Sequence, residues 1–268
     1  MHAELPLHQA VLSDDVAQIA ALIKDSCNLF KKNHEGLTAV ELAQFLGKKN
    51  SLRIFGTLPR SINIQLKGKD KVEQLTLEEY RVKLGINYTP WIRFENYEQM
   101  KKVRQNCPWL LRWKWSGKEN QELGQKYQQQ ISIGYTAPLF IKWINEQLGY
   151  GLFAAEDIDN GAFIGEYSGL IRRVYRRHPQ LNDYCFQYPS KYWSWCYFVV
   201  DAQHEGNYLR FANHSDRPNL QPQTAVDRGW LHQLFFANRK ISKGTQLTFD
   251  YGEDYWQRRK KIQIREMD

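Results

Sequence analysis

The chain has 268 residues, 42% of them hydrophobic, so it can bury a core as one large domain or as a domain with a small appendage. Its 37 lysines and arginines outnumber 29 acidic residues, and the formal net charge of +8 permits an anionic partner such as nucleic acid but also suits a solvated basic surface. None of the four cysteines forms a C-x-x-C pair, and no apolar run reaches about 18 residues, so the sequence predicts neither a metal site nor a membrane span.

The cysteines and the N-terminus also indicate a compartment. Four unpatterned thiols are typical of a reducing environment, and no apolar stretch near Met1 resembles a cleavable signal peptide. We therefore expect a soluble, intracellular protein. A secreted bacterial effector with a C-terminal or non-cleaved signal would show the same pattern.

The first 56 residues contain an internal repeat. Residues 6–10, "PLHQA", align with residues 39–43, "AVELA", at a separation of about 33 residues, which is the ankyrin spacing. Apolar residues at i, i+3 and i+4 predict a pair of helices in each unit. Two interpretations stay open: a surface that binds a protein partner or a second copy, and a helical cap on the following domain, which is the commoner case. His8 fits the buried histidine of such repeats and is assigned no chemistry.

Residues 57–137 read as a connecting or flanking region. Residues 75–86, "LTLEEYRVKLGI", predict a helix with two glutamates near its start. Residues 106–115, "NCPWLLRWKW", interleave tryptophans with cations, a pattern typical either of nucleic-acid stacking or of cations lying over a core. Residues 117–130 are polar and predict a surface loop or an exposed helix.

From about residue 138 the pattern changes to short strands separated by glycines, which predicts a compact fold of small β-sheets. The expected strands lie within residues 139–147, 151–158, 162–171, 184–189, 195–202, 231–241 and 245–251.

Four segments of this region occur in a fixed order. They are "GYGLFAAEDIDNGAFIGEYSGLI" (149–171), "YCFQYP" (184–189), "DAQHEGNYLRFANHSDRPNL" (201–220) and "FFANRKISKGTQLTFDYG" (235–252). Together they resemble the SET domain family of protein lysine methyltransferases. The resemblance implies an α+β fold of several small β-sheets with a knot-like threading, here preceded by the ankyrin-like helices.

The resemblance divides the chain into four parts: an ankyrin-like helical segment (1–56), the flanking region (57–137), a SET domain (138–256) and a C-terminal tail (257–268). In the implied fold, residues 213–215 cross residues 250–252. The tail carries four consecutive cations, which fit either a nuclear targeting patch or a solvated helix end.

The resemblance also implies S-adenosylmethionine as the methyl donor. Gly149, Tyr150 and Gly151 match a turn against the methionine part of the donor, where glycine lets the backbone approach closely. Asn213 and His214 match the pair that binds the amino-acid and adenine ends.

Two further residues are assigned to the cofactor site. Arg210 precedes the Asn–His pair and would be a site-organising cation or a member of a structural ion pair. Cysteine-rich zinc segments flank many relatives and are missing here, so another element must close the site. Tyr255 or Trp256 could pack over the adenine, and Trp256 is counted with the cofactor residues.

Three tyrosines match catalytic positions of the family: Tyr251, Tyr184 and Tyr167. Methyl transfer needs a neutral amine aligned with the bond from sulfur to methyl, whereas a free lysine has a pKa of about 10.4. An aromatic channel and a neighbouring sulfonium would both lower that pKa. Tyr251 would orient the amine and also contact the cofactor, while Tyr184, Phe249 and Tyr251 would line the substrate channel.

Phe249 matches a position that is phenylalanine or tyrosine in the family. Tyrosine there crowds the amine and favours a single methylation, while phenylalanine leaves room. The resemblance therefore implies di- or trimethylation.

The implied function is that of a chromatin regulator that methylates a lysine in a protein, with histone tails as the leading substrate. The zinc-free architecture is similar to bacterial members that act on host chromatin, so the compartment would be the nucleus, the host nucleus or the cytoplasm. The positive net charge suits contact with nucleosomal DNA, and a basic histone tail would need an acidic groove, for which Asp183, Glu156 and Asp157 are candidates.

Two alternatives stay open: a methyltransferase for a non-histone protein, and an inactive ankyrin–SET interaction module. The intact Asn213, His214 and Tyr251 argue against the second.

Overall fold

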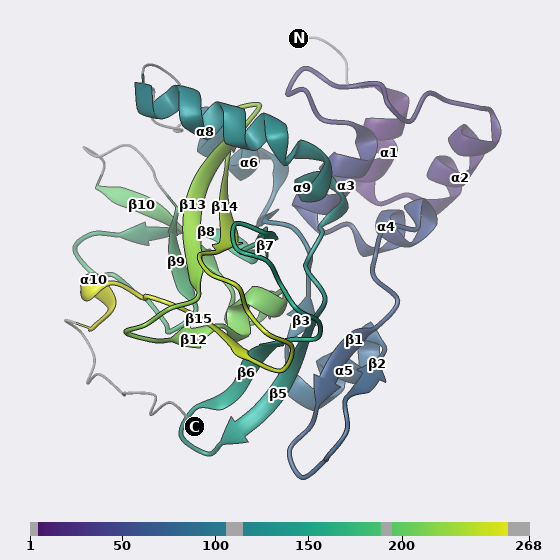
Figure 1. Ribbon diagram of the computed structural model, residues 1–268. Helices are drawn as coiled ribbons and strands as arrows, with labels where there is room; N and C mark the ends of the chain where they lie inside the picture. The colour runs from purple at the N-terminus through teal and green to yellow at the C-terminus, as the bar shows by residue number, and fades with distance from the viewer. Residues whose placement is uncertain (1–4, 106–114, 189–194, 257–268) are drawn as a thin grey trace.

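The computed structural model describes residues 5–105, 115–188 and 195–256. Figure 1 shows the N-terminal helices gathered at one end, beside a body of small twisted sheets that the rest of the chain builds. The helices are α1 (Pro6–Ser13), α2 (Val16–Lys24), α3 (Ala39–Leu46), α4 (Lys49–Phe55), α5 (Leu77–Leu84), α6 (Tyr97–Gln105), α8 (Trp115–Lys126), α9 (Gln128–Ile133) and α10 (Glu253–Trp256).

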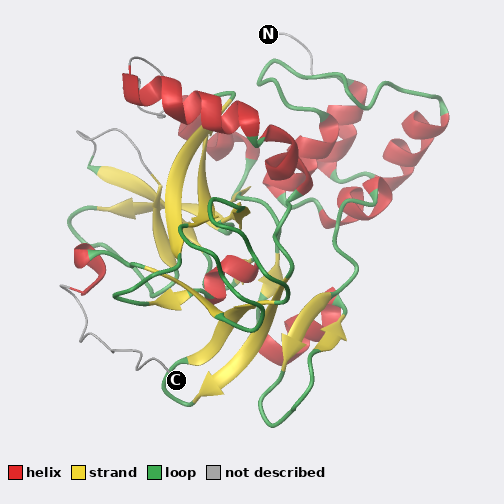
Figure 2. Cartoon of the chain, viewed as in Figure 1, coloured by secondary structure: helices red, strands yellow, loops and turns green. Residues whose placement is uncertain are grey.

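The strands form four sheets, as Figure 2 shows in yellow. The largest has the order β12-β15-β6-β5-β1-β2, and the others are β4-β8-β10-β9, β13-β14-β7 and β11-β3. Their bounds are β1 (Ile62–Gln65), β2 (Glu73–Leu75), β3 (Asn87–Tyr88), β4 (Arg93–Phe94), β5 (Leu139–Asn145), β6 (Gly149–Ala154), β7 (Phe163–Glu166), β8 (Leu170–Tyr175), β9 (Cys185–Tyr188), β10 (Cys196–Asp201), β11 (Glu205–Gly206), β12 (Asn213–His214), β13 (Leu220–Asp227), β14 (Trp230–Ala237) and β15 (Gln246–Phe249).

Helices α1 to α4 form two pairs, and α3 begins 33 residues after α1. The starts are set by side chains: Asp15 caps α2, and Thr38 forms a reciprocal capping box with Glu41 at the start of α3. His8 is buried and its Nε2 lies 2.9 Å from the Leu37 carbonyl oxygen, which ties the first pair to the loop before the second. The helix pairs form where the repeat predicts them, while their ankyrin-like character stays a prediction.

The flanking region supplies strands to three of the sheets. Strand β1 pairs in parallel with β5, β3 with β11, and β4 with β8. The sequence analysis missed these strands because each has only two to four residues, too few for a period to show. The helix predicted within residues 75–86 is α5. The polar segment 117–130, predicted to be a surface loop or an exposed helix, lies in α8 and α9, and α8 packs across β13. The aromatic residues 106–114 and the tail 257–268 lie outside the described residues.

The β-rich region follows much of the predicted pattern, but the short strands β11 and β12 were not predicted and two further segments differ. The expected strand at 162–171 is two strands, β7 and β8, because Gly169 between them packs against the Asp201 backbone, where a Cβ would lie 2.6 Å from the carbonyl oxygen. Strand β13 was not predicted, since proline and glutamines dilute its pattern. It pairs with β14 through a tight turn at Arg228 and Gly229.

The polar segment after η1 (Tyr208–Phe211) pairs in parallel with β15. Asn213 lies opposite Thr248 and His214 opposite Phe249, and the Ser215 amide donates to the Phe249 carbonyl oxygen at 3.3 Å. Residues 213–215 therefore lie beside the end of β15, and the Tyr251 amide donates to Nδ1 of His214 at 3.2 Å, so they also contact the segment 250–252 that they were expected to cross. The knot-like threading itself stays a prediction.

In residues 5–105, 115–188 and 195–256, no group of three or more histidine, cysteine or acidic side chains is placed to hold a metal ion. Within the same ranges, every helix is too short or too polar to cross a bilayer.

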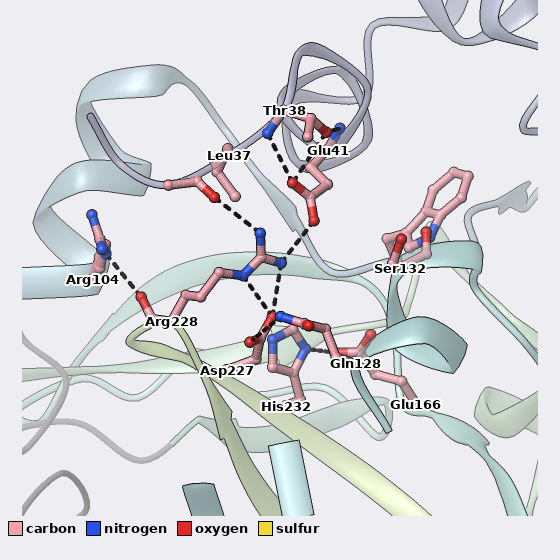
Figure 3. A network of polar contacts seen from close by, with 12 residues as sticks. Leu37, Thr38, Glu41, Arg104, Gln128, Ser132, Glu166, Asp227, Arg228 and His232 are labelled. Carbon is pink, nitrogen blue, oxygen red and sulfur yellow. Dashed lines mark hydrogen bonds and ion pairs between the residues drawn. The ribbon is translucent and has the colours of Figure 1, made fainter. Parts of the chain in front are cut away.

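Arg228 connects the N-terminal helices to the sheets. It occupies the left-handed region at φ 49°, followed by Gly229 at φ 88°, and this tight turn directs its side chain toward α3. Its guanidinium bonds Glu41 at 2.7 Å, the Gly36 carbonyl oxygen at 3.0 Å and Asp227 at 2.8 Å (Figure 3). Beside this network, the Phe45 ring of α3 packs 5.3 Å from Trp230.

We expect Arg228→Ala to destabilise the fold by about 2–3 kcal/mol, because it leaves two poorly solvated carboxylates without their cation. Urea denaturation measures this loss. Arg81→Ala removes an arginine from an exposed pair with Glu78 and should leave the midpoint unchanged. Equal midpoints for the two variants would contradict the assigned role of Arg228.

The same network predicts a pH dependence. Burial raises the pKa of Glu41, but hydrogen bonds from Arg228 and Thr38 outweigh it, so the pKa lies below its usual value of 4.5. The charged carboxylate therefore stabilises the fold above about pH 4.5, and this stabilisation is lost as the pH falls through the lowered pKa. Glu41→Gln should be less stable than wild type at pH 7, with a gap that narrows in acid. Urea midpoints between pH 3 and 7 measure it, and a constant gap would contradict the prediction.

Candidate active site

A cavity of about 720 Å³ opens where the second sheet meets the C-terminal part of the chain. Its wall comes from residues 176–187, strand β10, η1 and the residues that follow β15. It contains Tyr167, Tyr184, Phe249, Tyr251 and Arg210, so five of the residues predicted from the sequence lie around one space.

Aromatic rings form the buried part of this cavity. Tyr167 directly follows β7, and its hydroxyl donates to the Tyr184 carbonyl oxygen at 2.9 Å. The Phe186 ring lies 5.4 Å from Tyr167 and 6.1 Å from Phe249. Burial raises the pKa of Tyr167 far above its usual value, so its hydroxyl stays protonated. The space is therefore shaped to remove water from a narrow, apolar side chain.

Tyr251 is fixed from two sides at the end of β15. Its hydroxyl donates to the Ala212 carbonyl oxygen at 2.9 Å, and its amide donates to Nδ1 of His214 at 3.2 Å. Burial raises the pKa of Tyr251 well above its usual value. Its phenol can therefore hold a substrate atom through its oxygen but cannot serve as a base near neutral pH.

Arg210 contributes a cation to the cavity wall. Only 7% of the residue is exposed, its Nε donates to the Ala202 carbonyl oxygen at 2.8 Å, and its guanidinium lies 4.2 Å from the Tyr184 ring centre. No carboxylate among the described residues lies within ion-pair distance of it. The structural ion pair considered from the sequence is therefore absent from the described part of the chain.

Of the predicted cofactor residues, Arg210 and Tyr251 line the cavity, whereas the residues of β6 and β12 lie beside it. Gly149, Tyr150 and Gly151 belong to β6, and Asn213 and His214 belong to β12, with β15 between the two strands. The Tyr150 ring lies 6.3 Å from Phe211, which continues into β12.

Two observations bear on whether the end of the sheet formed by β12, β15 and β6 suits S-adenosylmethionine. Gly149 adopts φ +68° and a Cβ there would meet no atom within 4 Å, so the turn requires glycine and faces open space. The Asn213 Nδ2 is buried without a hydrogen-bond partner in the described structure. An unpartnered buried amide is costly unless a ligand satisfies it. The residues present therefore fit the amino-acid end of such a donor.

Helix α10 separates the two aromatic candidates at the C-terminus. Trp256 packs against the His214 ring at 4.8 Å, as expected of a residue on the cofactor side, and its buried Nε1 has no partner among the described residues. Tyr255 instead lines the cavity, and its hydroxyl lies 3.4 Å from Asp183. The three rings form one cluster: Tyr251 lies 4.7 Å from Tyr255 and 6.3 Å from Trp256, and Tyr255 lies 4.9 Å from Trp256.

The sequence analysis missed the loop that builds the outer wall. Asp201 accepts from Arg172 at 2.5 Å and from Asn182 at 2.8 Å, and these hydrogen bonds fasten residues 176–184 to the sheet. Burial raises the pKa of Asp201, but the two donors outweigh it, so the pKa is lowered and the carboxylate stays charged. The run of arginines and polar residues before Tyr184 was the sequence signal that could have indicated this loop.

The acidic groove expected for a basic substrate is only partly as predicted. Asp183 lines the cavity and is exposed, and the exposed Glu253 joins it. Glu156 and Asp157 do not line it, so their assignment was wrong: they lie in the turn after β6, where Asp157 accepts from the Lys243 amide at 2.8 Å.

Residues 149–252 match the family model described as SET domain. The histone-lysine N-methyltransferase, H3 lysine-36 specific, of Saccharomyces cerevisiae is 34% identical over 113 residues, 40% of this chain and 15% of that protein. The protein of the same description from Candida glabrata is 36% identical over 113 residues, with the same two coverages.

A crystal structure of KRYPTONITE in complex with mCHH DNA, H3(1–15) peptide and SAH is 31% identical, covers 42% of this chain and 23% of that one, and superimposes with a TM-score of 0.35. The chain spans less than a third of the length of the first curated relatives it matches. It thus contains a SET domain at residues 149–252, with histone-lysine N-methyltransferases among its relatives.

Proposed function

We propose that the protein is an S-adenosylmethionine-dependent protein lysine N-methyltransferase. The observation that supports it most is the aromatic cavity around Tyr251, which the chain builds from the segment that matches the SET domain. The fixed hydroxyls of Tyr167 and Tyr251 and the Phe249 ring define a space for a slender side chain that ends in an amine.

The chain's own residues would position and desolvate that amine. Tyr251 uses its proton on the Ala212 carbonyl oxygen, so its oxygen lone pairs remain to accept from the amine. The rings of Phe186 and Phe249 exclude water, which disfavours the ammonium form. Alignment of the neutral amine is the main contribution expected from the protein.

S-adenosylmethionine would supply the methyl group, bonded to a positively charged sulfur. Gly149 would let the backbone approach its methionine part, whereas Gly151 makes room for the side chains of Ile144 and Gln246. The unpartnered side-chain amide of Asn213 would bind the amino-acid end, and His214 with Trp256 would hold the adenine end. Tyr251 lies between this region and the cavity, since its amide bonds His214 and its ring lines the wall.

Histone tails are the proposed substrate, because the relatives named above are histone-lysine N-methyltransferases. The exposed Asp183 and Glu253 at the cavity would suit a basic peptide, and the net charge of +8 would suit nucleosomal DNA. The two alternatives are a methyltransferase for a non-histone protein and an inactive interaction module. The proposal also includes a bacterial effector as the origin of the protein, and N-terminal helices that bind a partner or self-associate. A nuclear or host-nuclear location belongs to the same proposal.

An assay with labelled donor on nucleosomes, free histones and bacterial extract tests this proposal and separates the alternatives. We expect transfer to a histone lysine. Tyr251→Phe should lower kcat at least about 100-fold, because the amine loses a positioned partner, while a melting curve confirms that the variant is folded. Donor binding by calorimetry without transfer to any lysine would instead favour the inactive module.

Phe249 provides a test of the methylation state. The ring lies 4.7 Å from Tyr251 and is 7% exposed, so a hydroxyl added to it would enter the space beside the amine. We expect wild type to give di- or trimethyllysine and Phe249→Tyr to stop at monomethyllysine. Mass spectrometry of the product measures this, and monomethyl product alone from wild type would contradict the assignment.

A further inference from the structure

The cations and carboxylates around the buried end of the cavity do not balance. Asp201 is paired with Arg172 at 2.5 Å, and Glu205 with Arg93 at 2.5 Å. Both pairs are largely shielded from water and are neutral overall. Neither carboxylate is left to compensate another cation.

The third carboxylate, Glu166, directly precedes Tyr167 and lies 2.6 Å from Nδ1 of His232. Burial alone would lower the pKa of His232, but the charge of Glu166 and its hydrogen bond outweigh burial and raise it. Glu166 therefore has His232 as its own hydrogen-bonded partner (Figure 3).

Arg210 is left with an uncompensated charge. Backbone carbonyl oxygens of Ala202 and Gln203 accept from its guanidinium at 2.8 and 3.4 Å, and the rings of Tyr184 and Phe211 lie 4.2 and 4.6 Å away. Carbonyl dipoles and ring faces orient a cation but carry no net negative charge. Because arginine does not lose its proton in proteins, the positive charge is permanent.

The field of this cation reaches the interior of the cavity. Burial raises the pKa of Tyr167, and the charge of Arg210 acts against that shift, as expected of a cation that stabilises a nearby phenolate. For an amine that enters beside Tyr167, the same charge lowers the pKa, since a nearby cation destabilises an ammonium.

The carboxylates of the cavity lie at its exposed edge, on Asp183 and Glu253, whereas Arg210, Tyr167 and Phe249 are buried. The exposed Arg176 lines the same edge, so the edge carries charges of both signs, whereas the buried interior carries the cation of Arg210.

We propose that the uncompensated charge of Arg210 promotes loss of the proton from the substrate lysine. The ammonium gives up one proton to bulk water through the open edge, and the neutral amine stays against Tyr251. This role rests on the proposed function and extends it, because it assigns deprotonation to the electrostatics of the cavity rather than to a general base.

The first test measures the rate against pH with a histone H3 tail peptide. Arg210→Gln should shift the rising limb of kcat upward by about one unit, or roughly tenfold in rate at fixed pH below the limb. Arg210→Lys keeps the charge and should keep the limb. Arg173→Gln removes an exposed arginine that does not line the cavity and should also keep it.

A less basic substrate distinguishes this role from a structural one. With γ-thialysine at the methylated position, the amine loses its proton more readily, so the defect of Arg210→Gln should shrink. A defect that is the same for lysine and γ-thialysine, with an unshifted limb, would overturn the proposal.

A second measurement does not depend on activity. In a Tyr184→His background, the imidazole replaces the ring that contacts Arg210, and NMR titration gives its pKa. Adding Arg210→Gln should raise that pKa by about one unit, whereas adding Arg173→Gln should not. An unchanged pKa would overturn the inference even if the enzyme methylates histones, and a raised pKa without methylation would count against the proposed function alone.

Discussion

The parallel pairing of β12 with β15 is the contact on which the site depends. It brings Asn213 and His214, which follow η1, beside Thr248 and Phe249, which lie more than 30 residues later in the chain. Tyr251 then reaches back to Ala212 and His214 through its hydroxyl and its amide. The polar run after a buried segment finds partners on the second segment, such as the Phe249 carbonyl oxygen for the Ser215 amide.

The second constraint is electrostatic. Each carboxylate shielded beside the cavity has its own partner: Arg172 for Asp201, Arg93 for Glu205 and His232 for Glu166. Removing charged groups from water is costly unless they are paired, so this arrangement reflects the general requirement of a protein interior. Arg210 departs from it at the one place where a neighbouring ammonium would have to lose its charge.

Sequence patterns predicted the strands with strong alternation and the residues that match a motif, and Tyr167, Tyr184, Phe249, Tyr251 and Arg210 do surround one cavity. They could not predict strands β1 to β4, which have two to four residues and depend on partners far along the chain. Nor could they place Asp157, whose carboxylate is used by a turn, or the loop fastened by Asp201, because such side-chain contacts leave no period in the sequence.

The Arg228 turn has a consequence for how the molecule holds together. Its side chain reaches Glu41 while Trp230 packs on Phe45, and strands β1 and β4 from the flanking region complete two of the sheets. Residues 149–252 alone would therefore lose these strand partners, the packing of Trp230 on Phe45 and the ion pair of Arg228 with Glu41, while Arg228 would keep Asp227. Residues 5–105 thus supply strand partners, an aromatic contact and an ion-pair partner to the part of the chain that matches the SET domain model.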